Sequence, residues 1–242
     1  MDGTPRELRE RIRAGRHDRP TAGLASGYVQ ANLVVLPARY ADDFLLFCTR
    51  NPRPCPLLEV TDTGSPEPRA TAPGADLRTD LPRYRVYRHG ELAAEPADVV
   101  GLWSQDLVAF LLGCSFTFES ALLRAGIPVR HLEQGRNVPM YRTAIPCRPA
   151  GAFSGPLVVS MRPMPPADAL RAATITARFP ARLRRPGRAQ ARRRAGLLGL
   201  RGDPAGGRGG EPARADAHPR TRPHVRHRPA RRVLGRPVAS GP

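Results

Sequence analysis

The first 180 residues alternate between short apolar runs bounded by turn residues and longer segments whose apolar positions recur at helical spacing. The apolar runs predict strands, and the helical spacing predicts amphipathic helices. The predicted strands are residues 27–37, 57–60, 83–88, 128–133 and 155–161, and the predicted helices are residues 4–14, 38–51, 104–112, 116–124 and 166–179. This order predicts an α/β fold, with a sheet that is mixed rather than purely parallel.

Local signals mark several of these boundaries. Thr4-Pro5-Arg6-Glu7 has the form of a capping box with proline in the first turn. His89-Gly90 predicts a hairpin turn into Glu91-Leu92. The Pro- and Gly-rich segment over residues 61–82 is long for a connection inside one domain, which indicates either a functional loop or disorder.

The pattern ends just after Phe179. Residues 181–242 contain no Phe, Tyr, Trp, Ile, Met, Cys, Asn or Lys, and their seventeen arginines face three acids, so they carry most of the net charge of +18. Such a composition cannot bury enough apolar surface to fold. We therefore expect one α/β domain over residues 1–180 and a disordered Arg-, Gly- and Pro-rich tail over residues 181–242.

Composition and motifs also predict where in the cell the protein is found and whether it needs a cofactor. The chain has no run of about 20 apolar residues and no apolar signal-peptide core, which predicts a cytoplasmic protein without a membrane partner. The four cysteines are scattered, with no C-x-x-C pair, and neither a phosphate-binding loop nor a dinucleotide fingerprint occurs. The expectation is a reaction that needs no metal and no other cofactor.

Two polar segments are candidates for chemistry. In residues 113–126 a glycine turn leads into a helix start, where the amides near Cys114 and Ser115 are placed to bind a substrate carboxylate. Glu119 is one turn further on, either as a proton-transfer group or as the acid of an ordinary capping box. From sequence alone the capping interpretation is favoured.

The second segment, residues 131–151, is densely polar. Its proton-transfer candidate is Glu133, and Tyr141 is a hydrogen-bond donor candidate for catalysis. Arg136, Asn137 and Arg142 are candidates for binding the substrate, because arginine suits bidentate recognition of a carboxylate. A solvated surface loop would have the same composition, and spacing alone leaves both interpretations open.

Longer matches are more specific than these short motifs. The chain closely resembles the hydro-lyase family related to D-glutamate cyclase over about residues 11–180. The resemblance is carried by PTAGLASGYVQANLVVLP, DFLLFCTRNPRPCPLLEVTD, APGADLRTDLPRYRVYR, VAFLLGCSFTFESALLRAGIPVRHLEQGRNVPMYRT and IPCRPAGAFSGPLVVSMRPMP. It implies an α/β sandwich with a smaller α/β lobe, and a lyase that removes water from a small carboxylic acid. In the cyclase relatives the implied reaction is dehydration of D-glutamate to 5-oxoproline.

The tail departs from this family, whose members continue as an ordinary globular region with a segment like THAPGHMFVTD. Permitted codons for residues 224–229, read one nucleotide forward, encode Met-Phe-Val-Thr-Asp, and the same offset back to His218 permits the rest of that segment. The sequence therefore predicts a reading-frame shift near Ala181, with the family's C-terminal part lost.

Two alternatives to an active lyase stay open. The truncated domain is inactive if the missing region is needed to cover its apolar surface. Alternatively, the arginine-rich tail binds nucleic acid non-specifically, although it lacks aromatic residues for base stacking. No specific nucleic-acid partner is expected, the substrate is a small carboxylic acid, and a homo-oligomer is left open.

Overall fold

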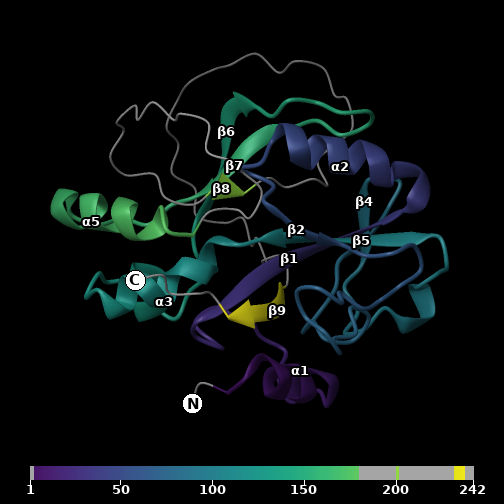
Figure 1. Cartoon of the computed structure of the whole chain (residues 1–242), viewed down its shortest axis with the longest axis horizontal. Helices are drawn as coiled ribbons and strands as arrows, with labels where there is room; N and C mark the ends of the chain where they lie inside the picture. The colour runs from purple at the N-terminus through teal and green to yellow at the C-terminus, as the bar shows by residue number, and fades with distance from the viewer. Residues whose placement is uncertain (1–2, 180–199, 202–231, 238–242) are drawn as a thin grey trace.

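The computed structural model describes residues 3–179, 200–201 and 232–237 (Figure 1). The α-helices are α1 (Pro5–Arg13), α2 (Ala41–Arg50), α3 (Glu119–Arg124), α4 (Arg130–Glu133) and α5 (Pro166–Thr176), and the 3₁₀ helices are η1 (Ala38–Tyr40), η2 (Val100–Leu102) and η3 (Ser115–Phe118). The strands are β1 (Tyr28–Pro37), β2 (Leu57–Val60), β3 (Val86–Arg88), β4 (Glu91–Ala94), β5 (Leu107–Gly113), β6 (Met140–Pro146), β7 (Pro156–Ser160), β8 (Leu200–Arg201) and β9 (Arg232–Pro237).

These strands form a central sheet of order β2-β5-β1-β9, a smaller sheet of order β6-β7-β8 and the β3-β4 hairpin. The predicted α/β fold is confirmed, and helices α3 and α5 contact each other beside these sheets (Figure 1). Every strand pair within the described ranges is antiparallel, so the sheets are not purely parallel, as expected, but they are not mixed either.

The two faces of the central sheet bury different apolar clusters, because successive side chains of a strand point to opposite faces. Ala109 and Leu111 of β5 pack against residues 72–84. Phe110 and the other β5 residues of the opposite face pack against α2. There the rings of Phe44 and Phe110 contact edge to face, with 4.8 Å between their centres. The long segment after β2 is therefore an ordered cover of the sheet.

Two sequence-based assignments were wrong. Residues 104–112 were predicted as a helix, but Leu107–Gly113 is the strand between β1 and β2. Val108 to Leu112 are all buried, and a strand covered on both faces is continuously apolar, so it lacks the alternation that distinguishes a strand from a buried helix.

The predicted strand over residues 128–133 is instead the single turn of α4. Its apolar signal came from Ile127 and Val129, which pack against Leu122 and Ala172. The segment therefore buries its apolar side chains against helices α3 and α5 and forms no strand.

Other predictions are confirmed. In α1 the hydroxyl of Thr4 accepts from the Glu7 amide at 3.3 Å, and the Glu7 carboxylate accepts from the Thr4 amide at 2.8 Å, which completes the capping box. The hairpin turns at His89 and Gly90, whose φ values of 52° and 85° are those of a two-residue hairpin loop. Strands β1, β2 and β7 and helices α2 and α5 lie in their predicted segments.

The predicted disordered tail falls mainly on residues outside the described ranges. The two tail segments that the structure describes are strands β8 and β9, which pair with β7 and β1, respectively. Sequence analysis did not anticipate either pairing.

Candidate active site

A cluster of five buried polar side chains lies where the central sheet, the smaller sheet and helices α3 and α4 meet. Its members come from η3, α3, α4, the end of β7 and the residues just after it: Ser115, Glu119, His131, Ser160 and Arg162. Glu119 and Arg162 are each only 2% exposed. Burying charged groups this deeply is costly unless they are paired, so the contacts within the cluster determine what it can do.

Arg162 donates hydrogen bonds to three other members of this buried cluster. Its Nε donates to Glu119 Oε1 at 3.0 Å, its Nη2 donates to Ser115 Oγ at 3.0 Å, and its Nη1 donates to Ser160 Oγ at 3.2 Å. The two serine hydroxyls are 3.3 Å apart. The guanidinium also stacks over the ring of Phe118, with 5.1 Å from Cζ to the ring centre. These contacts fix Arg162 in one orientation.

Glu119 is shared between Arg162 and His131. Nε2 of His131 lies 3.1 Å from Glu119 Oε1, within ion-pair distance when the imidazole is protonated. Within the described part of the chain, the second carboxylate oxygen, Oε2, is buried and has no hydrogen-bond partner. An unsatisfied buried oxygen on an otherwise engaged side chain is unusual, because nearly all buried polar atoms in proteins have a hydrogen-bond partner.

The electrostatics keep Glu119 charged. Burial by itself would raise the pKa of its carboxyl, but the facing His131 imidazole and the charge and hydrogen bonds of Arg162 outweigh burial and lower that pKa below its ordinary value. The carboxyl is therefore ionised at neutral pH, and a proton placed on it is readily given up.

Local sequence explains how these groups are positioned. Strand β5 ends at Gly113, and the Cys114 amide then donates to the Gln30 carbonyl at 2.9 Å, which ties the turn to β1. The ring of Phe116 stacks on His131 with 5.9 Å between ring centres. Phe116 also belongs to an apolar cluster with Cys114 and Val138, so the imidazole is held from one side by a fixed aromatic ring.

Two of the amides expected to bind a substrate carboxylate are already in use. The Cys114 amide donates to Gln30, and the Phe116 amide lies 3.3 Å from the Cys114 sulfur, its acceptor. The segment is a four-residue 3₁₀ helix rather than the start of a long α-helix. The capping role considered for Glu119 is also not what is found, because its contacts are with Arg162 and His131.

The structure separates the predicted site residues into two groups. Glu119, Cys114 and Ser115 are buried in or beside the buried cluster. The remaining candidates lie on α4, on β6 or between them, and most are exposed: Glu133, Arg136, Tyr141 and Arg142. Asn137 is half-buried, and its Oδ1 is buried with no hydrogen-bond partner among the described residues.

The segments that carry these candidates do come together. Val138, just after Asn137, packs with Cys114 and Phe116, and Ala22 from the turn-rich segment before β1 packs against the same group. On α4, His131 faces the buried carboxylate, whereas Glu133 is exposed. The predicted polar segment of residues 131–151 also contains a strand, β6, which was not expected.

Sequence reasoning missed His131, Ser160 and Arg162. His131 stands at the start of the polar segment that was considered, and Arg162 follows two residues after the buried strand β7. The signal that could have found Arg162 is a charged residue directly behind an apolar strand, although exposed arginines are common in that position. Arg162 is 43 residues from Glu119 and 47 residues from Ser115 in sequence, so only the fold brings these groups together.

Among the described residues, no group of three or more His, Cys, Asp or Glu side chains is arranged to bind a metal ion. Within the same part of the chain, none of the helices has both the length and the apolar character needed to cross a membrane.

Fold and site together define an α/β protein with a buried carboxylate, imidazole and guanidinium cluster. The family model for D-glutamate cyclase matches residues 108–198, a range that contains the whole cluster. A protein of Stutzerimonas stutzeri named "Putative hydro-lyase" is 64% identical over 179 residues, which are 74% of this chain and 68% of the relative.

Two further relatives carry the same kind of name. The "Putative hydro-lyase" of Rubrobacter xylanophilus is 67% identical over 175 residues, 72% of this chain and 68% of the relative. A relative from Geobacillus kaustophilus is 62% identical over 175 residues, 72% of this chain and 66% of the relative. The chain therefore belongs to the hydro-lyase family related to D-glutamate cyclase, as its sequence predicted, and it aligns with about two thirds of each relative's length.

Proposed function

We propose that this chain is a carbon–oxygen lyase that removes water from a small carboxylic acid, with D-glutamate as the first substrate to test. The proposal is supported by membership of the hydro-lyase family and by the match of residues 108–198 to the D-glutamate cyclase model. The single structural observation that carries it is the buried Glu119 carboxylate, which is charged, held by Arg162 and His131, and has one oxygen without a hydrogen-bond partner among the described residues.

In the proposed reaction, the amino nitrogen of D-glutamate forms a bond to the carbon of the side-chain carboxyl group, and a C–O bond of that carboxyl group breaks. The ammonium nitrogen loses two protons, and the departing carboxylate oxygen takes up both and leaves as water. Glu119 relays these protons one at a time, accepting each from nitrogen through Oε2 and returning it to the departing oxygen. A carboxyl with a lowered pKa suits the second step because, once protonated, it is a strong acid.

His131 and Arg162 are positioning residues in this scheme. Both contact Oε1 of Glu119, so they orient the carboxylate and hold it charged while Oε2 remains available. Ser115 contributes by fixing Arg162. This arrangement favours Glu119 over the exposed Glu133 as the proton-transfer group, although Glu133 remains a candidate from sequence.

Substrate binding is proposed for the side chains around α4 and β6. Arg136 and Arg142 are candidates for pairing with the substrate carboxylate, Tyr141 for donating a hydrogen bond, and Asn137 for binding through its buried oxygen. Cys114 and Ser115 are proposed to contact the same substrate. We also propose a cytoplasmic enzyme with a small-molecule substrate and no membrane or specific nucleic-acid partner, which cell fractionation and filter-binding assays would check.

The catalytic unit is proposed to be residues 1–180, followed by a tail read in a shifted frame. The expectation for the tail rests on composition and codon arithmetic, since residues 180–199 and 202–231 lie outside the described ranges. Sequencing the coding DNA around Ala181 tests it: a single inserted or deleted nucleotide is expected, and an intact frame conserved in independent isolates would contradict it.

The enzymatic proposal is tested by incubating the full chain, and a frame-restored version, with D-glutamate, L-glutamate and small hydroxy acids, and by measuring 5-oxoproline or the dehydrated acid. Glu119→Gln is expected to lower turnover by about 100-fold or more, as for a lost proton-transfer group. Glu91→Gln, at an exposed position on β4, is the matched control and is expected to behave as the parent. Full turnover by Glu119→Gln, or no turnover by either version with any substrate, would refute the proposal.

A further inference from the structure

Among the described residues, three side-chain oxygens are buried and have no hydrogen-bond partner: Glu119 Oε2, Asn137 Oδ1 and Asn32 Oδ1. A buried acceptor without a donor costs free energy, so each of these oxygens is a place where a ligand that donates hydrogen bonds would be stabilised. Asn32 belongs to strand β1 of the central sheet. Glu119 and Asn137 are linked to each other through two residues of the buried cluster.

The first link runs through helix α4. The Arg136 amide donates to the His131 carbonyl at 2.8 Å and closes the turn after α4, so Asn137 follows directly after this turn. The imidazole Nε2 of His131 lies 3.1 Å from Glu119 Oε1. Asn137 is therefore connected to the buried carboxylate by one short helix and its closing turn.

The second link runs along β7. The antiparallel pairing of β6 with β7 extends past Met140, because the Met161 amide donates to the Pro139 carbonyl at 3.0 Å. Residues 137–139 therefore run beside the segment that carries Arg162. Asn137 thus adjoins both segments whose side chains hold the buried carboxylate.

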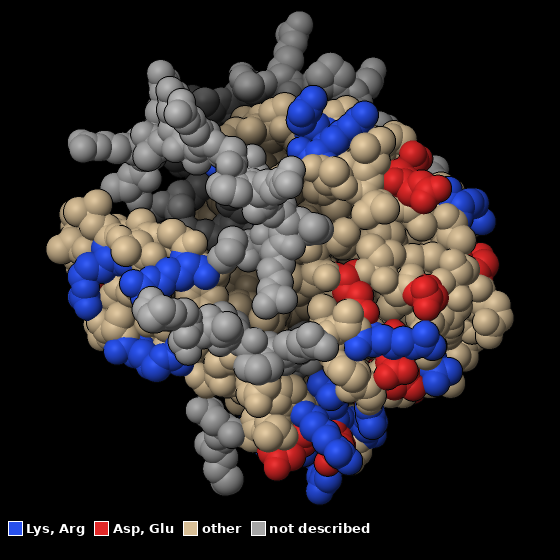
Figure 2. All heavy atoms as spheres, viewed as in Figure 1, with Lys and Arg blue, Asp and Glu red and all other residues tan. Residues whose placement is uncertain are grey.

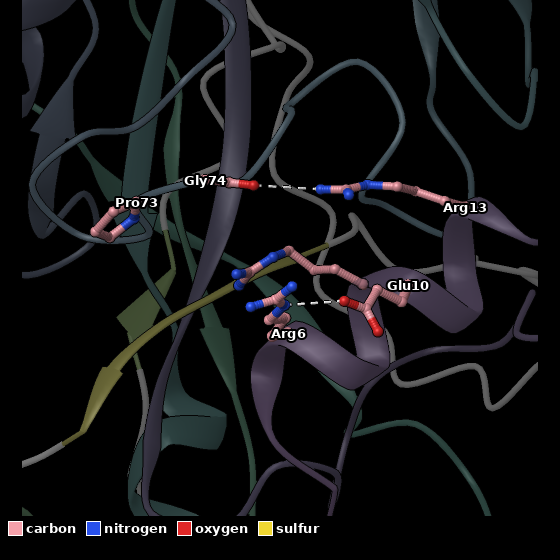
Figure 3. Close-up of a pocket in the computed structure, with 6 residues that line it drawn as sticks. Arg6, Glu10, Arg13, Pro73 and Gly74 are labelled. Atoms are coloured by element: carbon pink, nitrogen blue, oxygen red, sulfur yellow. Dashed lines mark hydrogen bonds and ion pairs between the residues drawn. The ribbon is translucent and has the colours of Figure 1, made fainter.

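The charged side chains at helix α1 show the opposite arrangement. In Figure 2 arginine side chains, with a few acids among them, gather at the lower edge of the molecule, where Figure 1 places α1. In the pocket of about 330 Å³ at α1, Arg6 donates to Glu10 at 2.9 Å and Arg13 donates to the Gly74 carbonyl at 3.4 Å (Figure 3). Arg13 also donates to the buried carboxylate of Asp80 at 2.8 Å. These donors already have acceptors within the protein, whereas the two oxygens near α4 are acceptors without a donor among the described residues.

An ammonium group suits two neighbouring acceptors. It carries three hydrogen-bond donors and no acceptor, whereas a hydroxyl carries a single donor. The Glu119 carboxylate is negatively charged at neutral pH, because His131 and Arg162 lower its pKa, so a cationic donor gains a charge-assisted hydrogen bond there. A hydroxyl in the same place would leave one of the two buried acceptors unpaired, which weakens binding.

We propose that Glu119 Oε2 and Asn137 Oδ1 together bind the ammonium group of the substrate, and that Asn137 sets the preference for an amino acid over the corresponding hydroxy acid. This amine subsite takes its substrate from the proposed lyase function and rests on it. Asn137 accepts a hydrogen bond from the nitrogen and keeps it in place while Glu119 removes the two protons. The substrate carboxylates are left to Arg136 and Arg142.

The test compares D-glutamate with its hydroxy analogue, in which a hydroxyl replaces the amino group. Ligand-observed NMR with the full chain, and with the frame-restored version, measures both dissociation constants and follows 5-oxoproline in the same spectra. Asn137→Leu removes the acceptor at similar size and is expected to lower the preference for D-glutamate about ten-fold, as for a lost hydrogen bond to a charged group. Asn137→Asp keeps an acceptor and should retain the preference. Gln134→Leu, an exposed amide in the turn before Asn137, is the matched control and should change nothing.

An unchanged preference in Asn137→Leu would overturn the amine subsite. So would D-glutamate binding that is ten-fold weaker in Asn137→Asp, because that result would mean that the amide donates to a substrate carboxylate. The expected preferences without any 5-oxoproline would contradict the lyase reaction alone, and turnover with an unchanged preference in Asn137→Leu would contradict the amine subsite alone. Absence of D-glutamate binding in both versions of the chain would overturn both proposals.

Discussion

Arg162 and Glu119 are 43 residues apart in sequence and form a buried ion pair in which the guanidinium Nε donates to Oε1 at 3.0 Å. Both side chains are almost completely excluded from water. A pair of this kind contributes little net stability relative to apolar residues of similar size, because desolvation offsets its Coulomb energy. Its presence where β7, α3 and α4 meet therefore fits a role in holding a charged carboxylate better than a role in stability.

Breaking this pair from one side should be costly. Arg162→Met leaves the Glu119 carboxylate buried and without its guanidinium, so we expect a loss of about 3–5 kcal/mol in the free energy of unfolding, measured in urea. The double variant Arg162→Met/Glu119→Leu removes both charges and should recover much of that loss. Arg53→Met, at an exposed position, is the control. Equal losses in the single and double variants would argue against an energetically coupled pair.

The Glu119 carboxylate should also determine how the free energy of unfolding falls at acid pH. Because the folded-state pKa of Glu119 is below its ordinary value of 4.5, its ionised form stabilises the fold above that pH. This stabilisation is lost as the pH falls through the lower folded-state pKa. We expect Glu119→Gln to flatten the fall in unfolding free energy below about pH 4.5, whereas Glu91→Gln keeps the parent slope. Parallel curves for the parent and Glu119→Gln would contradict the lowered pKa.

Tyr84 should determine how the free energy of unfolding falls at alkaline pH. Its hydroxyl donates to the Leu77 carbonyl at 2.8 Å and accepts from the Leu81 amide at 3.3 Å, so Tyr84→Phe leaves two buried groups unsatisfied and should cost about 1–3 kcal/mol at pH 7.

Burial raises the pKa of Tyr84 above its ordinary value of 10.0, so the neutral phenol stabilises the fold at lower pH, and this contribution falls as the pH rises above 10. Tyr84→Phe should therefore lose less stability above pH 10 than the parent. Tyr87→Phe, at an exposed position on β3, is the control and should follow the parent at both pH values.

Gly64 should tolerate an added methyl group poorly. Its φ is +79°, and an added Cβ would lie 2.6 Å from Gln105 Oε1 and 3.0 Å from the Gln105 carbonyl oxygen. Gly135 also has a positive φ, +59°, but nothing lies within 4 Å of an added Cβ. Both alanine variants bear the left-handed strain of about 1–2 kcal/mol, and Gly64→Ala should lose about 1–3 kcal/mol more in urea unfolding. Equal losses would mean that the segment around Gln105 moves aside freely.

The elements that sequence reasoning found are those with strong local signals. The capping box before α1, the hairpin at His89 and Gly90 and the apolar run of β1 between turn residues are each encoded within a few neighbouring residues. Strand β5 was missed because its apolar run has no period of its own, and its assignment depends on β1 and β2 lying on either side.

The candidate site divides in the same way. Glu119 and Ser115 could be proposed from their own segment, because a polar turn after an apolar run is a recognisable pattern. Their partner Arg162 could not, because nothing near Glu119 in the sequence indicates which of the chain's many arginines lies beside it. The same holds for the pairing of Asp80 with Arg13, which are 67 residues apart.

The amino-acid sequence by itself determined the family, the α/β class, most of the helices and strands and the break in composition after Phe179, because these depend on local propensity and on long stretches of similar residues. Only the tertiary structure decided that Glu119 is a buried, charged carboxylate held by His131 and Arg162, and that most of the other candidates are exposed. The reason is physical: burial and pairing depend on which distant segments pack together, and they set the protonation state on which the proposed chemistry rests.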